Sequence, residues 1–360
     1  MDIGIIGLPR SGKTTLFNAV TKGKINVATY SNKPNVGVTK VPDDRLQVLE
    51  KMYNPRKVIH AEVTYTEVPP PPEGFGKTRG IGGEYLNALQ SSDALLIVLR
   101  SFDEPSVAHI DETVDAGRDL QNMLMELMFS DIGIVERRLS RIESGFKAVK
   151  SQEKELLVRE QHLLEKLKSK LEEGILLRDQ QVTSDELIQL SGFGFLSMKP
   201  IIAVINLGED QLVDSATFEL AIAAETNIRV TSVCAQLEME LTQMEPIDED
   251  EFRQSLGILE SGLNKMIKVS YEVVDQIAFF TVGEDEVRAW EIKRHTIAQK
   301  AAGKIHSDLE RGFIRAEVIT YSDLISSGSL SEGRKRGVLR QEGKEYVVQD
   351  GDIMQILFNI

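Results

Sequence analysis

The segment Gly7-Leu8-Pro9-Arg10-Ser11-Gly12-Lys13-Thr14 has the residue types and the spacing of a phosphate-binding loop. Its glycines let the backbone pass close to an anion, so that successive N–H groups point at phosphate oxygens. Lys13 would bring a positive charge to the terminal phosphates as the catalytic cation, and Thr14 would place a hydroxyl on Mg²⁺. The predicted phosphate-binding residues are Pro9, Arg10, Ser11, Gly12, Lys13, Thr14 and Thr15.

A second element suited to a nucleotide follows the predicted strand Ile201 to Ile205. Asn206-Leu207-Gly208-Glu209 stands where GTPases of this architecture carry Asn-Lys-x-Asp, whose aspartate accepts both N–H groups of the guanine edge. Glu209 is one methylene longer, and a bidentate contact with guanine is sensitive to that shift, whereas adenine offers an amino donor. The element favours adenine, with Asn206, Leu207 and Glu209 at the base; the alternative is that Asn206 only opens a turn.

A third segment, Cys234-Ala235-Gln236, follows the predicted strand Ile228 to Val233. Folds of this kind place a backbone N–H near the base at this point, so these three residues complete the predicted nucleotide-binding set. Cys234 is the only cysteine, which excludes an internal disulfide and a cysteine-cluster metal site.

The strands that must position these loops are short and apolar. Val, Ile, Leu and Ala nearly fill four runs, at Asp2 to Ile6, Ala94 to Leu99, Ile201 to Ile205 and Ile228 to Val233. Runs of this kind are typical of parallel strands buried on both faces. A fifth run, Val58 to Val68, alternates and is predicted to be an edge strand or an antiparallel partner. With helices between them, the strands predict a doubly wound, mostly parallel α/β sheet.

The stretch from about Val135 to Gly174 repeats leucine and isoleucine at helical spacing among charged residues. It predicts one arm of a helical hairpin, and Thr183 with Glu186 predicts a capped second helix. The hairpin is either an arm that binds a partner or a structural insertion. Together the patterns predict a discontinuous nucleotide-binding domain at 1–134 and 195–277, a helical insertion at 135–194, and a small α+β domain at 278–360.

The predicted C-terminal domain contains short strands at Ala278 to Val282, Glu317 to Thr320, Tyr346 to Val348 and Asp352 to Phe358. It also holds the densest basic run of the chain, Gly333-Arg334-Lys335-Arg336-Gly337. Its flanking glycines predict an exposed loop, which would either contact RNA phosphates or form solvated surface.

The composition is that of an ordinary globular protein. Of 360 residues, 41% are hydrophobic and 27% are charged, with a mean hydropathy of -0.17. No apolar run has the length of a membrane span, and the N-terminus lacks the positive charge of a signal peptide, so we expect a cytoplasmic protein that does not bind a membrane. The net charge of -14 argues against a surface that is basic throughout.

Several segments together resemble the YchF family of Obg-related P-loop NTPases over essentially the whole chain. Besides the phosphate loop and Asn206-x-x-Glu209, they are Pro34 to Val38, Glu286 to Trp290, Ala302 to Asp308, Gly312 to Val318 and Tyr346 to Asp352. The resemblance implies a nucleotide domain, a coiled-coil insertion and a C-terminal TGS domain with a β-grasp fold. It also implies association with ribosomes, and a preference for ATP over GTP because of Asn-x-x-Glu.

The chain departs from the family in the elements that sense the γ-phosphate. Members carry Asp-x-x-Gly after the third strand, whereas here Glu67 stands for the acid and Pro70 for the glycine, and proline has no N–H to offer. Ser31 stands for the switch threonine, so the metal ligands implied are Thr14, Ser31 and Glu67. The following run, Gly74 to Gly80, either brings Lys77 or Arg79 to the phosphates as a further catalytic cation or is a flexible surface loop.

Three functions remain open. The first is a ribosome-associated switch that binds ATP with Mg²⁺ and hydrolyses it slowly or only with a partner, as a weak nucleoside triphosphatase. The second is a translation-linked GTPase, which Glu209 disfavours. The third is a module that holds nucleotide without hydrolysing it, which Pro70 favours. We expect a monomer that contacts the ribosome or ribosomal RNA through the helical arm and the TGS domain, without recognising a DNA sequence.

Overall fold

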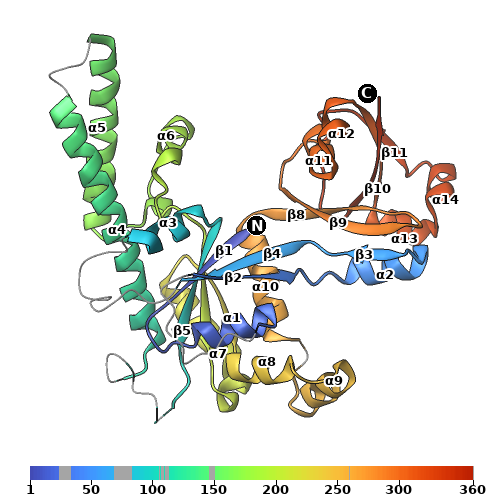
Figure 1. The fold of residues 1–360 in the computed structure, drawn as a ribbon, viewed down its shortest axis with the longest axis horizontal. Helices are drawn as coiled ribbons and strands as arrows, with labels where there is room; N and C mark the ends of the chain where they lie inside the picture. The colour runs from blue at the N-terminus through green and yellow to red at the C-terminus, as the bar shows by residue number, and fades with distance from the viewer. Residues whose placement is uncertain are drawn as a thin grey trace. The chain divides into compact units, whose positions relative to one another are not determined.

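The computed structural model describes residues 1–23, 34–68, 83–104, 106, 109, 113–145, 151–258 and 260–359 (Figure 1). The chain divides into two compact units, each built from two stretches of sequence. Unit 1 comprises Met1–Val38 and Thr64–Met266, and unit 2 comprises Thr39–Val63 and Ile267–Ile360. This division differs from the predicted one, because residues 39–63 belong with the C-terminal part and the helical insertion belongs with unit 1.

Unit 1 is built on a doubly wound sheet, as the sequence predicts. The order of its six described strands is β2-β4-β1-β5-β6-β7. Their bounds are β1 Asp2–Ile6, β2 Asn35–Lys40, β4 Glu62–Glu67, β5 Ala94–Arg100, β6 Ile201–Asn206 and β7 Arg229–Val233. β1 pairs in parallel with β4 and β5, and β6 pairs in parallel with β5 and β7. Every residue of β5 and β6 is buried, which explains why both are apolar up to their last residues, Arg100 and Asn206.

The run Val58 to Val68 corrects one sequence prediction. It is not a single edge strand: it forms β3 (Lys57–Ile59) and β4, which belong to different sheets. β4 lies inside the sheet of unit 1, parallel to β1, with Asp2 opposite Thr64. Its residues alternate between buried and more exposed positions. The alternation therefore came from unequal cover of the two faces of an interior strand, which sequence periodicity does not distinguish from an edge.

The helices of unit 1 flank the sheet and form the predicted hairpin (Figure 1). They are α1 Lys13–Thr21, α3 Gly83–Ser91, α4 Ala116–Gly145, α5 Ser151–Glu172, α6 Ser184–Leu190, α7 Ser215–Glu225, α8 Ala235–Leu241 and α9 Pro246–Ser255. The residues of α10, Gly262–Val273, are divided between the units after Met266. α4 starts well before the predicted arm. Thr183 and Glu186 form the predicted capping box at the start of α6.

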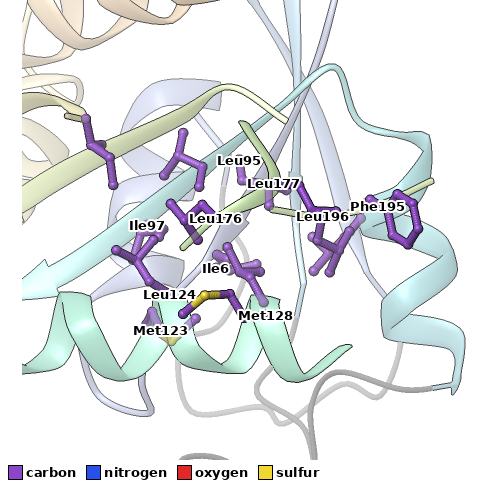
Figure 2. Close-up of a cluster of buried hydrophobic side chains, with 14 of the residues drawn as sticks. Ile6, Leu95, Ile97, Met123, Leu124, Met128, Leu176, Leu177, Phe195 and Leu196 are labelled. Atoms are coloured by element: carbon purple, nitrogen blue, oxygen red, sulfur yellow. The ribbon is translucent and has the colours of Figure 1, made fainter. Parts of the chain in front are cut away.

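The first half of α4 packs on the sheet and its second half packs on α5. Figure 2 shows Met123, Leu124 and Met128 of α4 against Ile6 of β1 and Ile97 of β5. Beyond this core, buried leucines of α5 pack in the same cluster as residues of α4. Polar side chains also join the two helices of the hairpin. Those contacts are Arg138 to both carboxylate oxygens of Glu160, each at 2.7 Å, and Lys168 to Glu136 at 2.7 Å.

One buried carboxylate ties α4 to the segment before β6. Asp131 is fully buried, and its oxygens accept the backbone N–H groups of Leu196 and Ser197, both at 2.8 Å. The Ser197 hydroxyl donates a third bond, at 2.6 Å. A buried carboxylate requires such donors, so Asp131 fixes where the hairpin helix meets the loop that leads into β6.

Unit 2 is a mixed sheet with the order β11-β10-β12-β8-β9-β3. The further strands are β8 Gln276–Thr281, β9 Glu286–Lys293, β10 Phe313–Thr320, β11 Arg340–Glu342 and β12 Asp352–Phe358; the helices are α2 Asp44–Tyr53, α11 Ala298–Ile305, α12 Ser307–Arg311, α13 Tyr321–Ser327 and α14 Leu330–Lys335. β8 pairs with β9 as an antiparallel hairpin and with β12 in parallel. Ala298, Ala301 and Ala302 of α11 pack in the core of this unit, as a β-grasp arrangement requires.

Segment 39–63 completes unit 2 from an early part of the chain. β3 adds a parallel edge strand to β9, with Lys57 opposite Glu286. At the start of α2, Arg45 bonds Asp43 and Asp350 at 2.8 Å each. Its guanidinium also lies 5.0 Å from the ring centroid of Phe280. The segment is therefore held by both backbone and side-chain contacts.

Two predictions for unit 2 were wrong. Tyr346 to Val348 is not a strand, because only Val347 makes an isolated bridge, to Ile297. The basic run is not a loop between glycines: it ends helix α14, and its Gly333 is buried. Its cations are paired with acidic neighbours, Arg334 with Glu317 at 2.6 Å and both Lys335 and Arg336 with Glu332. The pairing lowers the positive charge that this surface offers to phosphate.

Candidate nucleotide-binding site

The loop between β1 and α1 has a backbone that few residues other than glycine can adopt. Gly7, Arg10 and Gly12 have φ angles of 154°, 65° and 90°. A Cβ atom on Gly7 would lie 2.5 Å from the Val98 carbonyl oxygen, and one on Gly12 would collide with the side-chain amide of Asn206. Both glycines are therefore needed for close packing as well as for conformation.

Lys13 is buried at the start of α1 and folds back onto its own loop. Its Nζ atom donates to the carbonyl oxygens of Gly7, at 3.0 Å, and Leu8, at 2.7 Å. Burial lowers the pKa of Lys13 to about 8, while the neighbouring Glu67 carboxylate acts in the opposite direction. A phosphate anion at this loop would offer the ammonium a stronger partner than two carbonyl groups do.

Glu67 ends β4 and meets Thr14 and Asn35. It is only 3% exposed, and each of its carboxylate oxygens accepts one hydrogen bond. The Thr14 hydroxyl donates to Oε1 at 2.5 Å, and the Asn35 amide donates to Oε2 at 2.8 Å. A hydroxyl beside a carboxylate is the hard oxygen donor set that Mg²⁺ prefers, so these residues fit a magnesium ion. The structure thus brings together two of the three implied metal ligands.

The remaining phosphate-loop residues differ in exposure. Arg10 is exposed, whereas Pro9 and Thr15 are half-buried. Ser11 is buried, and its hydroxyl oxygen has no hydrogen-bond partner among the described residues. Ser31 lies outside the described residues, as do Pro70, Lys77 and Arg79.

Asn206 connects the phosphate loop with the segment after β7. Its Nδ2 donates to the Ser11 carbonyl oxygen, and its Oδ1 accepts from the Ala235 N–H, both at 3.0 Å. The residue is buried and does more than open a turn. Leu207 is also buried and its N–H donates to the Val233 carbonyl oxygen, whereas Glu209 is exposed at the start of a short 3-10 helix, Glu209–Asp214.

Cys234 and Ala235 form the buried start of α8, next to Asn206. Burial raises the pKa of the Cys234 thiol, and the Glu209 and Glu238 carboxylates add to the effect. Gln236 is exposed and bonds Glu240 at 2.5 Å, so it faces away from this contact with Asn206.

Sequence reasoning assigned no role to three residues around the site. Glu238 is a buried residue of α8 that accepts from Arg253 at 2.7 Å and from the Gly262 N–H at 2.7 Å. Phe102 lies beside Gly12 and Gly208. Asn35 lies in the family-like segment Pro34 to Val38, which by itself assigns it no role. Nothing local marks these residues, because each acts on a partner distant in sequence.

A loop with buried lysine between strand and helix, on a doubly wound sheet, defines a P-loop nucleoside triphosphate-binding protein. Two family models match: MMR_HSR1, a 50S ribosome-binding GTPase, at residues 2–136, and YchF-GTPase_C, a protein of unknown function (DUF933), at residues 276–359. The YchF match falls in unit 2. No described helix combines the length and apolarity that crossing a bilayer requires.

Relatives that match over the whole length of the chain identify its family within this class of nucleotide-binding proteins. The chain is 38% identical to "Ribosome-binding ATPase YchF" of Bacillus subtilis, with 100% of both chains covered, and 36% identical to the protein of that name in Haemophilus ducreyi, with 99% of both covered. The solved structure of the Schizosaccharomyces pombe YchF GTPase matches with a TM-score of 0.85 and 29% identity, covering 99% of this chain and 97% of that one. The chain belongs to the YchF family, as its sequence motifs indicated.

Proposed function

We propose that this chain is a nucleotide-dependent switch that associates with ribosomes and binds ATP together with Mg²⁺. The observation that carries the proposal is that the Thr14 hydroxyl bonds the buried Glu67 carboxylate next to the buried Lys13 at the phosphate loop, with Glu67 close enough to act on the charge of Lys13. A lysine cation beside a hydroxyl–carboxylate pair supplies the groups that a magnesium triphosphate requires. Relatives matched over the whole chain are named ribosome-binding ATPases, which supports the partner.

Adenine is the proposed base. Both ends of the Asn206 amide are occupied within the protein, so this residue shapes the base pocket by joining its two loops. Leu207 offers a buried apolar side chain where a lysine would otherwise stand, and the exposed Glu209 is free to accept an amino group. GTP is the alternative, because one matching family model is named for a GTPase.

Magnesium is the proposed metal, held by Thr14 and Glu67 and by Ser31. When bound, it would neutralise charge on the phosphate oxygens. The protein's own part is to keep the Glu67 carboxylate aimed at Thr14, and to hold the Lys13 ammonium in a buried position from which it can reach the phosphates.

The proposed partner is the ribosome or its RNA, which would place the protein in the cytoplasm. The α4–α5 hairpin and the C-terminal unit are the proposed contact regions. The basic end of α14 would contribute less than its sequence suggests, because Glu317 and Glu332 pair with its cations.

Hydrolysis is proposed to be slow or dependent on the partner. Pro70 stands where the family has a glycine N–H for the γ-phosphate, and proline has no such donor. The same residue favours the alternative of a module that binds nucleotide without cleaving it. Phosphate release measured with and without ribosomes separates the two. A rate of about 1 to 100 s⁻¹ from the isolated protein, typical of kinases, would refute slow hydrolysis.

Binding is tested by calorimetric titration with ATP and with GTP, each with Mg²⁺. We expect ATP to bind at least about tenfold tighter, which corresponds to about 1.4 kcal/mol. Lys13→Ala should abolish binding, whereas Lys22→Ala, which changes an exposed lysine just after α1, should leave it unchanged. Tighter binding of GTP would overturn the role of Glu209. Absence of binding would overturn the proposed function.

A further inference from the structure

Asn35 links the start of β2 to the carboxylate of the metal site. It is the first residue of β2, and β2 is the neighbour of β4 in the sheet. Its Nδ2 atom donates to Glu67 Oε2 at 2.8 Å, while Thr14 donates to the other oxygen, Oε1. The two donors thus approach different oxygens of one buried carboxylate.

The second donor matters because position 67 is a glutamate. A glutamate side chain has one more rotatable bond than an aspartate, so a carboxylate at the same strand position is less well fixed by its own stem. A hydrogen bond on each oxygen removes that freedom. The carboxylate is only 3% exposed, so these two donors stand in for the water that it lacks.

We propose that Asn35 is a positioning residue for nucleotide-bound magnesium: its amide holds Glu67 in the orientation that presents Oε1 to Thr14. The inference rests on the proposed function and names a residue that acts through Glu67 without touching the nucleotide.

Fixing Glu67 affects metal-dependent binding more than nucleotide binding as such. In the absence of metal, the loop N–H groups and Lys13 still face the phosphates, and neither contacts Asn35. Loss of the amide should therefore weaken the gain in affinity that Mg²⁺ provides. A purely structural role would change the affinity equally with and without the metal.

The experiment measures the affinity of a fluorescent N-methylanthraniloyl ATP in Mg²⁺ and in EDTA. For Asn35→Ala we expect the affinity ratio between the two buffers to fall at least threefold, with the affinity in EDTA unchanged. Val36→Ala is the matched control, since Val36 is the next residue of β2 and its side chain is 64% exposed. Asn35→Ser, which is polar but too short to reach Glu67, serves as a second variant should the alanine variant fold poorly.

A double-mutant cycle tests the path through Glu67. If Asn35 acts through that carboxylate, Asn35→Ala should add little to the loss already caused by Glu67→Gln. An unchanged ratio in both Asn35 variants, or equal losses in Mg²⁺ and EDTA, would overturn this proposal while leaving the proposed function intact. If the unaltered protein binds nucleotide in neither buffer, both proposals fail.

Discussion

Lys13 combines a functional position with an energetic cost. The residue is 5% exposed and its ammonium donates to the Gly7 and Leu8 carbonyl oxygens, and this burial lowers its pKa to about 8 from 10.5. The site therefore holds a charge that bulk water would hold more favourably. A bound triphosphate would relieve that cost, and the relief would contribute to the affinity with which nucleotide stabilises the native protein.

The lowered pKa of Lys13 makes stability depend on pH. Between about pH 8 and 10 the unfolded chain keeps the proton that native Lys13 releases, so the native state gains stability as the pH rises. Relative to Lys13→Met, the unaltered protein should gain about 2 to 3 kcal/mol over this range. Urea unfolding at stepped pH measures the difference. A difference that does not change with pH would show that Lys13 titrates normally.

The sequence predicts a single site residue when the motif that marks it is formed by neighbouring positions. Lys13 and Thr14 follow from one uninterrupted motif, whereas Asn35 and Glu238 act on partners 32 and 15 residues away in sequence. No periodicity or spacing rule reports such side-chain contacts. Asn206 lies between these cases, since its position was marked but its two bonds to the loops were not.

At the scale of elements, Asp131 shows how one side chain sets the position of a helix. Asp131→Ala would leave two buried N–H groups and one hydroxyl without their acceptor. We expect a loss of about 2 to 4 kcal/mol in the free energy of unfolding. Urea denaturation measures it, with the exposed Asp210→Ala as control. Equal stability of the two variants would contradict the role assigned to Asp131.

The α4–α5 hairpin offers a second prediction at this scale, from two leucines of one helix. Leu164 is 0% exposed within the seam, whereas Leu156 is 66% exposed. Leu164→Ala should cost about 2 to 5 kcal/mol because it opens a cavity, and Leu156→Ala should cost little. Thermal unfolding followed by circular dichroism compares them. Similar melting temperatures would mean that the seam does not stabilise the arm.

The fully buried strands were predicted more accurately than the partly exposed segments. The unbroken apolar runs of β5 and β6 permit one interpretation, and both were found as predicted. Val58 to Val68 and Tyr346 to Val348 carry weaker patterns that other structures satisfy equally well. The basic run at the end of α14 was misread because glycine signals a loop only where nothing packs against it, and Gly333 is buried.

At the scale of the whole molecule, the sequence did not indicate that segment 39–63 belongs to unit 2. Its polar contacts on unit 2 differ in burial, which gives a matched test. Asp350 bonds Arg45 and also accepts the Ala278 N–H at 3.0 Å, whereas the Arg56–Asp285 pair is 84% and 87% exposed. Asp350→Ala should lower the free energy of unfolding by about 1 to 3 kcal/mol, and Asp285→Ala by less than about 1 kcal/mol.

Differential scanning calorimetry measures both variants. If the Asp350 variant melts like the Asp285 variant, the Arg45 contact does not hold the segment, and backbone pairing of β3 with β9 must do so alone.

The order of units along the chain has a consequence for synthesis on the ribosome. Lys57 finds its partner Glu286 only after more than two hundred further residues have been added. At about 5 to 20 residues per second, that delay is on the order of 10 to 50 s. During this interval α2 and β3 emerge with no sheet to join, and an early stop or a pause before residue 286 leaves them exposed to chaperones and proteases. The last segment translated thus decides whether one of the first can fold.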